Sequence, residues 1–151
     1  MNSDFKDLLS AFNAHGVECL VVGAFALAAH GRIRATGDID IWVRPSTENA
    51  ARVLKALVVF GAPLHDLTAT DLSRPGLVFQ IGIAPLRINI LTGIDGVEFP
   101  EAWSSRIETR IGDQPVGVLS VEHMIRNKRA AGRAQDLADL EWLENPDKRD
   151  L

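Results

Sequence analysis

The sequence predicts a single α/β domain, of the α+β kind, with a mixed β-sheet flanked by helices and further helices at its C-terminal end. Helical and strand-like segments alternate through residues 1–60, four strand-like segments follow, and the tail is helical. The chain has 151 residues and no long linker, so we expect one domain over residues 1–151.

The first half of the chain predicts three helices and two strands. Large apolar residues recur at helical spacing between Ser3, a candidate N-cap, and Gly16, a candidate stop. The apolar run 17–22 is typical of a buried strand, and the alanine-rich stretch after it of a short helix. Helix 48–60 is expected to begin after Pro45 with Ser46 or Thr47 and to end at Gly61. The predicted strands are 17–22 and 38–43, and the other predicted helices lie between Ser3 and Gly16 and over 24–30.

The second half predicts four strands and then two helices. Gly112-Asp113-Gln114 separates two β-rich segments and predicts a hairpin. Ser120 is a candidate N-cap for the first helix of the tail, and Gly132 separates it from the second. The four predicted strands are 77–83, 85–91, 106–111 and 115–120.

Composition limits the cellular setting and the classes of partner. The net charge of −4 argues against an extended nucleic-acid surface, although it leaves room for a small basic pocket. No apolar run approaches the ~20 residues that span a bilayer, and the N-terminus does not resemble a signal peptide. The lone Cys19 cannot form an internal disulfide. We therefore expect a cytoplasmic protein with no membrane partner.

The predicted strand 38–43 carries an unusual pair of carboxylates. Side chains alternate along a strand, so Asp38, Asp40 and Trp42 should share one face. Two carboxylates held close together repel, and a divalent cation such as Mg²⁺ between them removes that conflict. The alternative is a half-exposed strand with aspartates on its solvated face, although aspartate is a poor strand former.

The surrounding sequence resembles a known signature. Residues 21–43, VVGAFALAAHGRIRATGDIDIWV, are similar to the nucleotidyltransferase fold of the DNA polymerase beta superfamily, in which a glycine turn, a helix and an Asp-x-Asp strand follow one another. The subgroup that it most resembles contains small nucleotidyltransferases related to abortive-infection type toxins. Residues 85–103 and 118–143 also resemble that subgroup. The shared positions in the first segment are His30-Gly31, Arg34, Thr36 and Asp38-Ile39-Asp40.

The resemblance implies magnesium-dependent transfer of a nucleoside monophosphate from an NTP, most simply ATP, to an acceptor hydroxyl. The acceptor would be an RNA end such as that of tRNA, a protein or a small molecule. Asp38 and Asp40 would ligate the metal. The partners would be the nucleotide, the acceptor and either a toxin–antitoxin partner or a second copy of the chain. The residues implied in nucleotide binding are Gly23, Ala24, Arg34, Thr36, Lys128 and Arg133.

Two positions depart from the family pattern. Ala24 follows Gly23 where a second glycine or a serine is usual, which removes a hydroxyl but keeps the backbone N–H. Asn89 occupies the place of the third catalytic carboxylate, so its neutral side chain can ligate a metal only weakly and cannot act as a base. Either another carboxylate such as Asp95 substitutes for it, or one metal suffices, or the protein binds nucleotide with little turnover.

Other functions and other roles therefore stay open. The chain could be a weak or inactive nucleotide-binding regulatory module, or a partner-binding component of a toxin–antitoxin-like system. A structural loop role is equally compatible with Arg34 and Thr36. Arg126 and Arg129 are expected on the surface, and His30 is expected to cap a helix. Asp136 and Asp139 are expected to form structural salt bridges, with contact to the substrate as the alternative for Asp136.

Overall fold

The computed structural model describes residues 3–33, 37–82 and 87–149. Its centre is a six-stranded mixed sheet in the order β3-β4-β2-β1-β6-β5. The strands are β1 (Cys19–Val22), β2 (Asp38–Val43), β3 (Val78–Ile81), β4 (Arg87–Leu91), β5 (Ile107–Ile111) and β6 (Gln114–Val118). This arrangement confirms the predicted α/β class with a mixed sheet.

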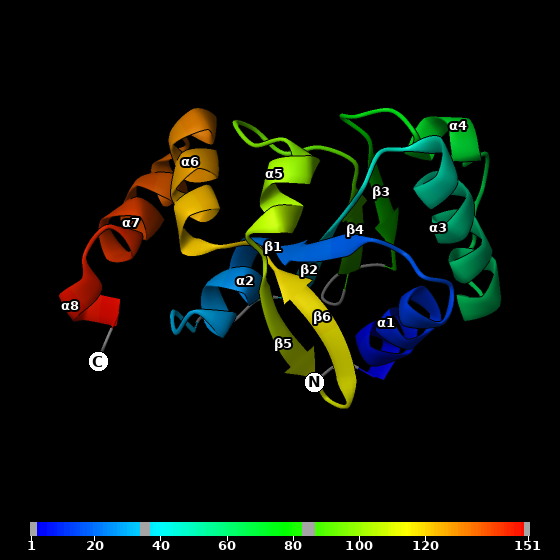
Figure 1. The fold of residues 1–151 in the computed structure, drawn as a ribbon, viewed down its shortest axis with the longest axis horizontal. Coiled ribbons are helices and arrows are strands. Elements are labelled where there is room, and N and C mark those ends of the chain that lie inside the picture. The colour runs from blue at the N-terminus through cyan, green and yellow to red at the C-terminus, as the bar shows by residue number, and fades with distance from the viewer. Residues whose placement is uncertain (1–2, 34–36, 83–86, 150–151) are drawn as a thin grey trace.

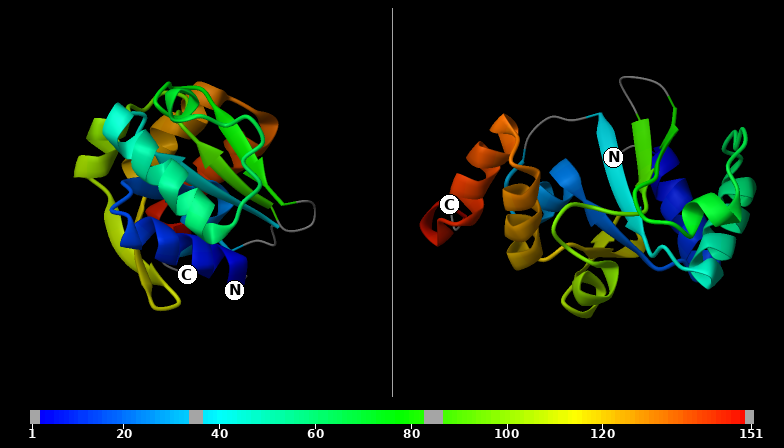
Figure 2. Two further views of the ribbon diagram at one scale, coloured as in Figure 1. Left: turned by 90° about the vertical axis from the view of Figure 1, so that its right-hand side faces the viewer. Right: turned by 90° about the horizontal axis from the view of Figure 1, so that it is seen from above.

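Two groups of helices lie to either side of the sheet, with α5 between them in the view of Figure 1. Helices α1 and α3 lie on one side and α6, α7 and α8 on the other, which the view from above also shows (Figure 2). The helix bounds are α1 (Ser3–Ala14), α2 (Gly23–Ala29), α3 (Thr47–Phe60), α4 (Ala69–Leu72), α5 (Phe99–Ser104), α6 (Val121–Ala131), α7 (Ala134–Leu143) and α8 (Pro146–Arg149).

The local signals predicted several of these boundaries. Strand β2 covers the predicted residues 38–43. Ser46 caps α3 by accepting a hydrogen bond from the backbone N–H of Asn49, and Gly61 ends the helix in the left-handed conformation. Ser120 caps α6 in the same way, and Gly132 ends it. Strands β1 and β5 begin later than predicted, at Cys19 and Ile107, β3 is shorter at both ends, and β6 runs from Gln114 to Val118 instead of over 115–120. Residues 83, 85 and 86 of the predicted strands lie outside the described residues, and β4 covers 87–91.

The core fixes which face of β2 is left for polar groups. Ile39, Ile41 and Val43 are buried, whereas Asp38 and Asp40 are only partly buried. On the aspartate face, the ring of Trp42 meets Phe99 of α5 edge to face, with the ring centroids 5.0 Å apart. The apolar packing therefore stops before Asp40 and leaves its carboxylate at the edge of an opening.

No helix in the described part of the chain combines the length and the apolar character needed to cross a membrane.

Candidate active site

Three neighbouring strands bring the polar residues together. Asp40 pairs with Val22 across the antiparallel β1–β2 ladder and with Asn89 across the parallel β2–β4 ladder. Asp38 lies opposite Arg87 in the latter ladder. Residues paired across a ladder project on the same face, so Asn89 is directed toward Asp40, as the strand alternation predicts.

Gly23 makes close contact with Asp40 possible. Its φ is +70°, a conformation that other residues rarely adopt, and it begins α2 directly after β1. A Cβ atom at this position would lie 2.5 Å from Oδ2 of Asp40. The glycine is therefore required both by the backbone conformation and by the carboxylate beneath it.

A pocket of about 350 Å³ opens beside these two residues. Asp95 approaches it from a two-residue turn, while Lys128 of α6 and Arg133, the N-cap of α7, supply positive charge. The pocket joins the end of β1, the middle of β2, the end of β4 and the α6–α7 junction. Its lining residues are Val22, Gly23, Asp40, Leu91, Ile94, Asp95, Asn127, Lys128, Ala131 and Arg133.

Asp40 has a perturbed protonation equilibrium. Burial raises the pKa of its carboxyl above the ordinary aspartate value, and the nearby negative charge of Asp38 raises it further. A hydrogen bond from Asn89 and the positive charges of Lys128 and Arg133 oppose the rise without cancelling it. A carboxylate that is costly to ionise gains from a bound cation, so this pocket favours one.

Asp38 is engaged by a neighbouring cation. Nε of Arg87 lies 3.0 Å from Oδ1 of Asp38, and Nη2 lies 3.4 Å from Oδ2. Asp38 is near enough to perturb Asp40, but its side chain does not line the pocket. The two aspartates therefore share a strand face while only Asp40 reaches the opening.

Asn89 acts as a bridge in this structure. Its Nδ2 donates to Oδ1 of Asp40 at 2.9 Å, and its Oδ1 accepts from Nε2 of Gln80 at 3.2 Å. The amide oxygen is thus directed toward β3 and the amide nitrogen toward the carboxylate. In this orientation Asn89 stabilises Asp40 as a hydrogen-bond donor and presents no oxygen to a cation beside it.

The donor set suits one magnesium ion better than two. Mg²⁺ is often held by one or two carboxylates together with substrate phosphates, and Asp38 and Asp40 can supply those carboxylates. Within the described ranges there is no cluster of three or more His, Cys, Asp or Glu side chains suited to a metal ion. Position 89 contributes an amide instead of a third carboxylate, so a second ion would need another ligand such as Asp95, which also lines the pocket.

Lys128 and Arg133 are held by buried carboxylates. Nζ of Lys128 lies 3.2 Å from Asp136 Oδ1 and 3.1 Å from Asp139 Oδ2. Nε of Arg133 lies 2.9 Å from Asp136 Oδ2. The predicted salt-bridge role of the two aspartates is therefore confirmed, and their partners include both cations of the pocket.

Several other predicted residues lie away from the pocket. Ala24 is in the first turn of α2 and does not line it. Arg34 and Thr36 fall outside the described residues.

His30 is the C-cap residue of α2, as expected, and its Nε2 lies 2.9 Å from the carbonyl oxygen of Leu119. Arg126, which is half-buried, and the exposed Arg129 form ion pairs with Glu101 and Glu144, respectively.

The sequence interpretation gave no role to four residues that hold the site in place: Arg87, Gln80, Arg32 and Asn127. A signal existed for Arg87, because it shares the strand face of Asn89 at spacing i, i+2. Asn127 stands directly before Lys128 in the segment that resembles the family, whereas Gln80 carried no comparable signal, since its contact depends on strand order.

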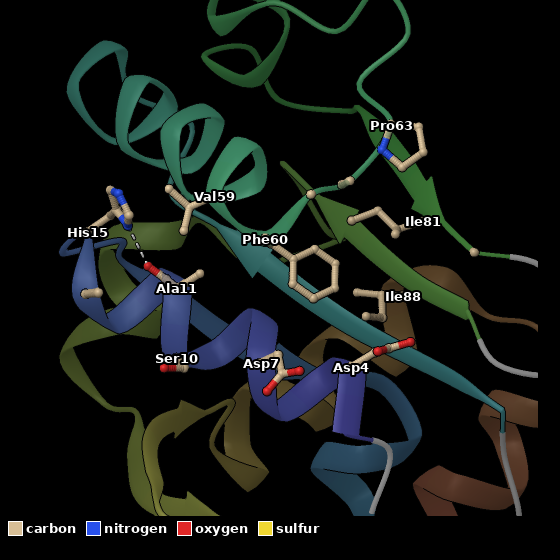
Figure 3. Close-up of a pocket in the computed structure, with 14 residues that line it drawn as sticks. Asp4, Asp7, Ser10, Ala11, His15, Val59, Phe60, Pro63, Ile81 and Ile88 are labelled. Carbon is tan, nitrogen blue, oxygen red and sulfur yellow. Dashed lines mark hydrogen bonds between the residues drawn. The ribbon is translucent and has the colours of Figure 1, made fainter.

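A larger pocket of about 590 Å³ lies between α1 and α3 (Figure 3). Its floor includes Phe60, Ile81 and Ile88, and the carboxylates of Asp4 and Asp7 lie along α1. Ile88 is adjacent in β4 to both Arg87 and Asn89, so by alternation it faces the opposite side of the sheet. This pocket is therefore separate from the Asp40 pocket, and none of the described residues that line it is a lysine or an arginine.

Comparison with solved structures identifies relatives of this fold. A candidate nucleotidyltransferase from Thermotoga maritima (TM1012) matches with a TM-score of 0.62 and 15% identity, over 93% of this chain and 90% of that one. The antibiotic-resistance factor ANT(2'')-Ia matches with a TM-score of 0.62 and 17% identity, over 98% of this chain and 86% of that one. At these identities, the matches show a shared fold.

No curated protein matches the sequence. A family profile described as "Nucleotidyl transferase of unknown function (DUF2204)" matches residues 1–149, almost the whole chain. This match and the shared fold confirm the resemblance to small nucleotidyltransferase-fold proteins, while the abortive-infection type subgroup stays a prediction. The chain therefore belongs to the nucleotidyl transferase family of that description.

Proposed function

We propose that this protein transfers a nucleoside monophosphate from a magnesium-bound NTP to an acceptor hydroxyl, with turnover attenuated by Asn89. The main supporting observation is that Asp40, Lys128 and Arg133 surround one pocket beneath Gly23. A carboxylate on one side and two cations on the other suit the two ends of a metal–triphosphate unit. ATP is the donor to test first.

Each side chain has a defined part in this proposal. Asp40, with Asp38 beside it, would hold one Mg²⁺, which when bound would neutralise phosphate charge and favour ionisation of the acceptor hydroxyl. Lys128 and Arg133 would bind the phosphates that leave as pyrophosphate. Gly23 leaves room for the nucleotide next to Asp40, and the backbone N–H of Ala24 is available at the same turn.

The ion pair between Arg87 and Asp38 limits how Asp38 can bind a metal ion. It contacts both carboxylate oxygens of Asp38, so full metal ligation by Asp38 requires this guanidinium to move or to share the carboxylate. Among the described residues, Asp40 has no such arginine partner: its Oδ1 accepts from Asn89, and its Oδ2 is the atom nearest to a Cβ built on Gly23. We therefore assign the principal metal contact to Asp40 and a supporting one to Asp38.

A second candidate function is nucleotide binding with almost no turnover. The observation that favours it is the hydrogen bond from Asn89 to Asp40, because an amide donor occupies the position where the family pattern expects a third carboxylate. The acceptor is proposed only by class: an RNA end, a protein or a small molecule. A toxin–antitoxin partner and a cytoplasmic location are proposed on the sequence resemblance alone.

Calorimetry can test the donor site directly. We expect MgATP to bind the wild-type chain and to lose affinity in Asp40→Asn and Lys128→Met. Arg129→Met is the matched control, because Arg129 is an exposed cation of the same helix that does not line the pocket. Absence of magnesium-dependent binding in the wild type would refute both nucleotide functions.

Labelling can then separate transfer from binding. Wild type and Asn89→Asp would be incubated with α-labelled ATP, Mg²⁺ and, in turn, tRNA, total protein and a small-molecule extract. Label on an acceptor with the wild-type chain supports the enzyme. Label only with Asn89→Asp identifies the natural protein as a binder whose fold still permits the chemistry.

A further inference from the structure

We propose that Asp136 is the residue that positions the phosphate-binding side of the pocket. This single carboxylate holds Lys128 and Arg133 together, so that both cations can contact one anion. The inference rests on the proposed function and deepens it. In this view, a buried residue outside the pocket controls the affinity for the nucleotide.

The contacts of Lys128 leave part of its ammonium group for a ligand. Its side chain is only 7% exposed, and its Nζ is shared between Asp136 Oδ1 and Asp139 Oδ2. An ammonium group has three N–H donors, so two carboxylate contacts leave one. Lys128 also lines the pocket and lowers the pKa of Asp40 through its charge, which places the ammonium near that carboxyl.

Arg133 is attached to the same carboxylate from the other side. Its Nε and Nη2 lie 2.9 and 3.4 Å from Oδ2 and Oδ1 of Asp136, and its backbone N–H donates to Oδ2 at 3.0 Å. The remaining guanidinium N–H groups extend from a side chain that is 64% exposed. Without Asp136, nothing comparable in the described residues would hold this long side chain at the pocket.

The local fold explains how one residue reaches both cations. Gly132 ends α6 in the left-handed conformation, and Arg133 becomes the N-cap of α7. This reversal brings Asp136, at the third position of α7, back beside Lys128 in the last turn of α6. Asp136 is completely buried, and hydrogen bonds from Arg133 and Lys128 lower its pKa although burial alone would raise it.

Asp139 provides an informative comparison. It is equally buried and also contacts Lys128, but it pairs with Nε of Arg32, in the segment that follows α2, and not with Arg133. A purely structural network would make Asp136 and Asp139 interchangeable for nucleotide affinity. The positioning role requires the larger effect at Asp136, because only Asp136 holds both pocket cations.

The sign of the expected effect separates positioning from simple electrostatics. Asp136→Asn removes one negative charge close to the pocket, and that alone would strengthen the binding of an anion. A loss of affinity therefore has to come from displaced cations. We expect at least a tenfold loss for MgATP, and a smaller loss for Asp139→Asn.

The experiment uses calorimetry with two probes, MgATP and inorganic tripolyphosphate without metal. Variants are Asp136→Asn, Asp139→Asn, Lys128→Met and the Asp136→Asn/Lys128→Met double variant, with Glu144→Gln as control. Glu144 pairs with Arg129 across the same two helices but away from the pocket, so this control should bind both probes like the wild type. If Asp136 acts largely through Lys128, the double variant should lose less than the product of the two single losses.

The outcomes distinguish this inference from the proposed function. Failure of the wild type to bind either probe refutes both. If the wild type binds, three results would overturn the positioning role alone. These are unchanged or tighter binding by Asp136→Asn, equal losses of affinity in Asp136→Asn and Asp139→Asn, and fully multiplicative losses in the double variant.

A measurement on the wild type covers the case in which Asp136→Asn does not fold, since breaking a buried ion pair is strongly destabilising. The ε-ammonium group of Lys128 would be observed by NMR after ¹⁵N-lysine labelling and assigned by its absence in Lys128→Met. We expect a protected signal that shifts on addition of tripolyphosphate and still shows hydrogen-bonded protons. A signal that is unprotected, or unchanged by tripolyphosphate, contradicts the proposal.

Discussion

The side-chain amide of Asn89 donates a hydrogen bond to the carboxylate of Asp40, with 2.9 Å between Nδ2 and Oδ1. The contact joins the parallel strands β2 and β4, and Gln80 of β3 donates a hydrogen bond to the amide oxygen of Asn89. It satisfies one oxygen of a partly buried acid whose pKa is raised. The amide of Asn89 therefore stabilises the metal-free site, whereas an aspartate there would provide a third metal-binding carboxylate.

Asn89→Asp should convert the site into a stronger metal site. Without Mg²⁺ the added carboxylate repels Asp40, so the melting temperature should fall below that of the wild type. With Mg²⁺ and ATP the loss should be recovered, and nucleotide transfer should rise at least tenfold, equivalent to about 1.4 kcal/mol of transition-state stabilisation. Thermal scans with and without MgATP, and label transfer, would measure both effects.

Asn89→Ala is the matched control for that change. It removes the hydrogen bond to Asp40 without adding a charge, so it should destabilise the apo protein and give no gain with Mg²⁺. Equal behaviour of the aspartate and alanine variants in MgATP would show that position 89 does not contribute to the metal site.

Gly23→Ala should disable the site while leaving most of the fold intact. The substitution forces a residue with a Cβ into φ +70°, at a cost of about 1–2 kcal/mol, and places that Cβ 2.5 Å from Asp40 Oδ2. The carboxylate has to move, so MgATP affinity should fall together with stability. Calorimetry and chemical denaturation would report the two losses.

Gly16→Ala isolates the backbone part of this effect. Gly16 has a nearly identical φ of +67°, but its added Cβ would meet no described atom within 4 Å. It should lose comparable stability from backbone strain and retain wild-type MgATP affinity. A similar loss of affinity in both variants would contradict the specific role of Gly23.

The ionisation of Asp40 should make stability pH-dependent in a defined direction. Because its pKa is higher in the folded than in the unfolded chain, the folded state holds this proton more tightly. The corresponding stability is present below the ordinary aspartate pKa and is lost as the pH rises through the raised value. Metal-free Asp40→Asn should therefore be more stable than the wild type at pH 7, and this advantage should vanish in acid.

Denaturation in EDTA at a series of pH values would test this prediction. The difference in unfolding free energy between Asp40→Asn and the wild type should increase as the pH rises through the raised pKa and then level off. A difference that is constant with pH would mean that Asp40 does not titrate differently in the two states.

Cys19 should be unreactive in the native protein. Burial in β1 raises the pKa of its thiol to about 12, so almost no thiolate exists at neutral pH, and the side chain is also shielded from reagents. A thiol-specific dye should label the native chain very slowly and the unfolded chain once. Fast labelling without denaturant would contradict the packing of β1.

Much of the fold could be predicted because its signals are local. The alternation in residues 38–43 predicted β2 and the shared face of its aspartates, and Ser46 and Ser120 predicted two helix starts. Helices α4, α5 and α8 were missed, since each is too short to show helical periodicity. For α4 the capping box of Thr68 and Asp71 was an available signal.

The composition of the site was partly predictable, but its connections were not. The family resemblance selected Gly23, Asp40, Lys128 and Arg133, which the structure places around one pocket. That Asp38 would pair with Arg87 rather than line the pocket depends on strand order and register. Such long-range pairing leaves no local pattern in a single sequence.

The pocket draws its groups from segments that are far apart in synthesis. Asp40 comes from an early strand, Asp95 from the middle of the chain, and Lys128 and Arg133 from the α6–α7 junction. A nascent polypeptide on the ribosome thus acquires its carboxylates long before its phosphate-binding cations. We therefore expect the full chain to be retained on immobilised ATP. A chain truncated before α6 lacks Lys128 and Arg133 and should not be retained, even if its sheet has formed.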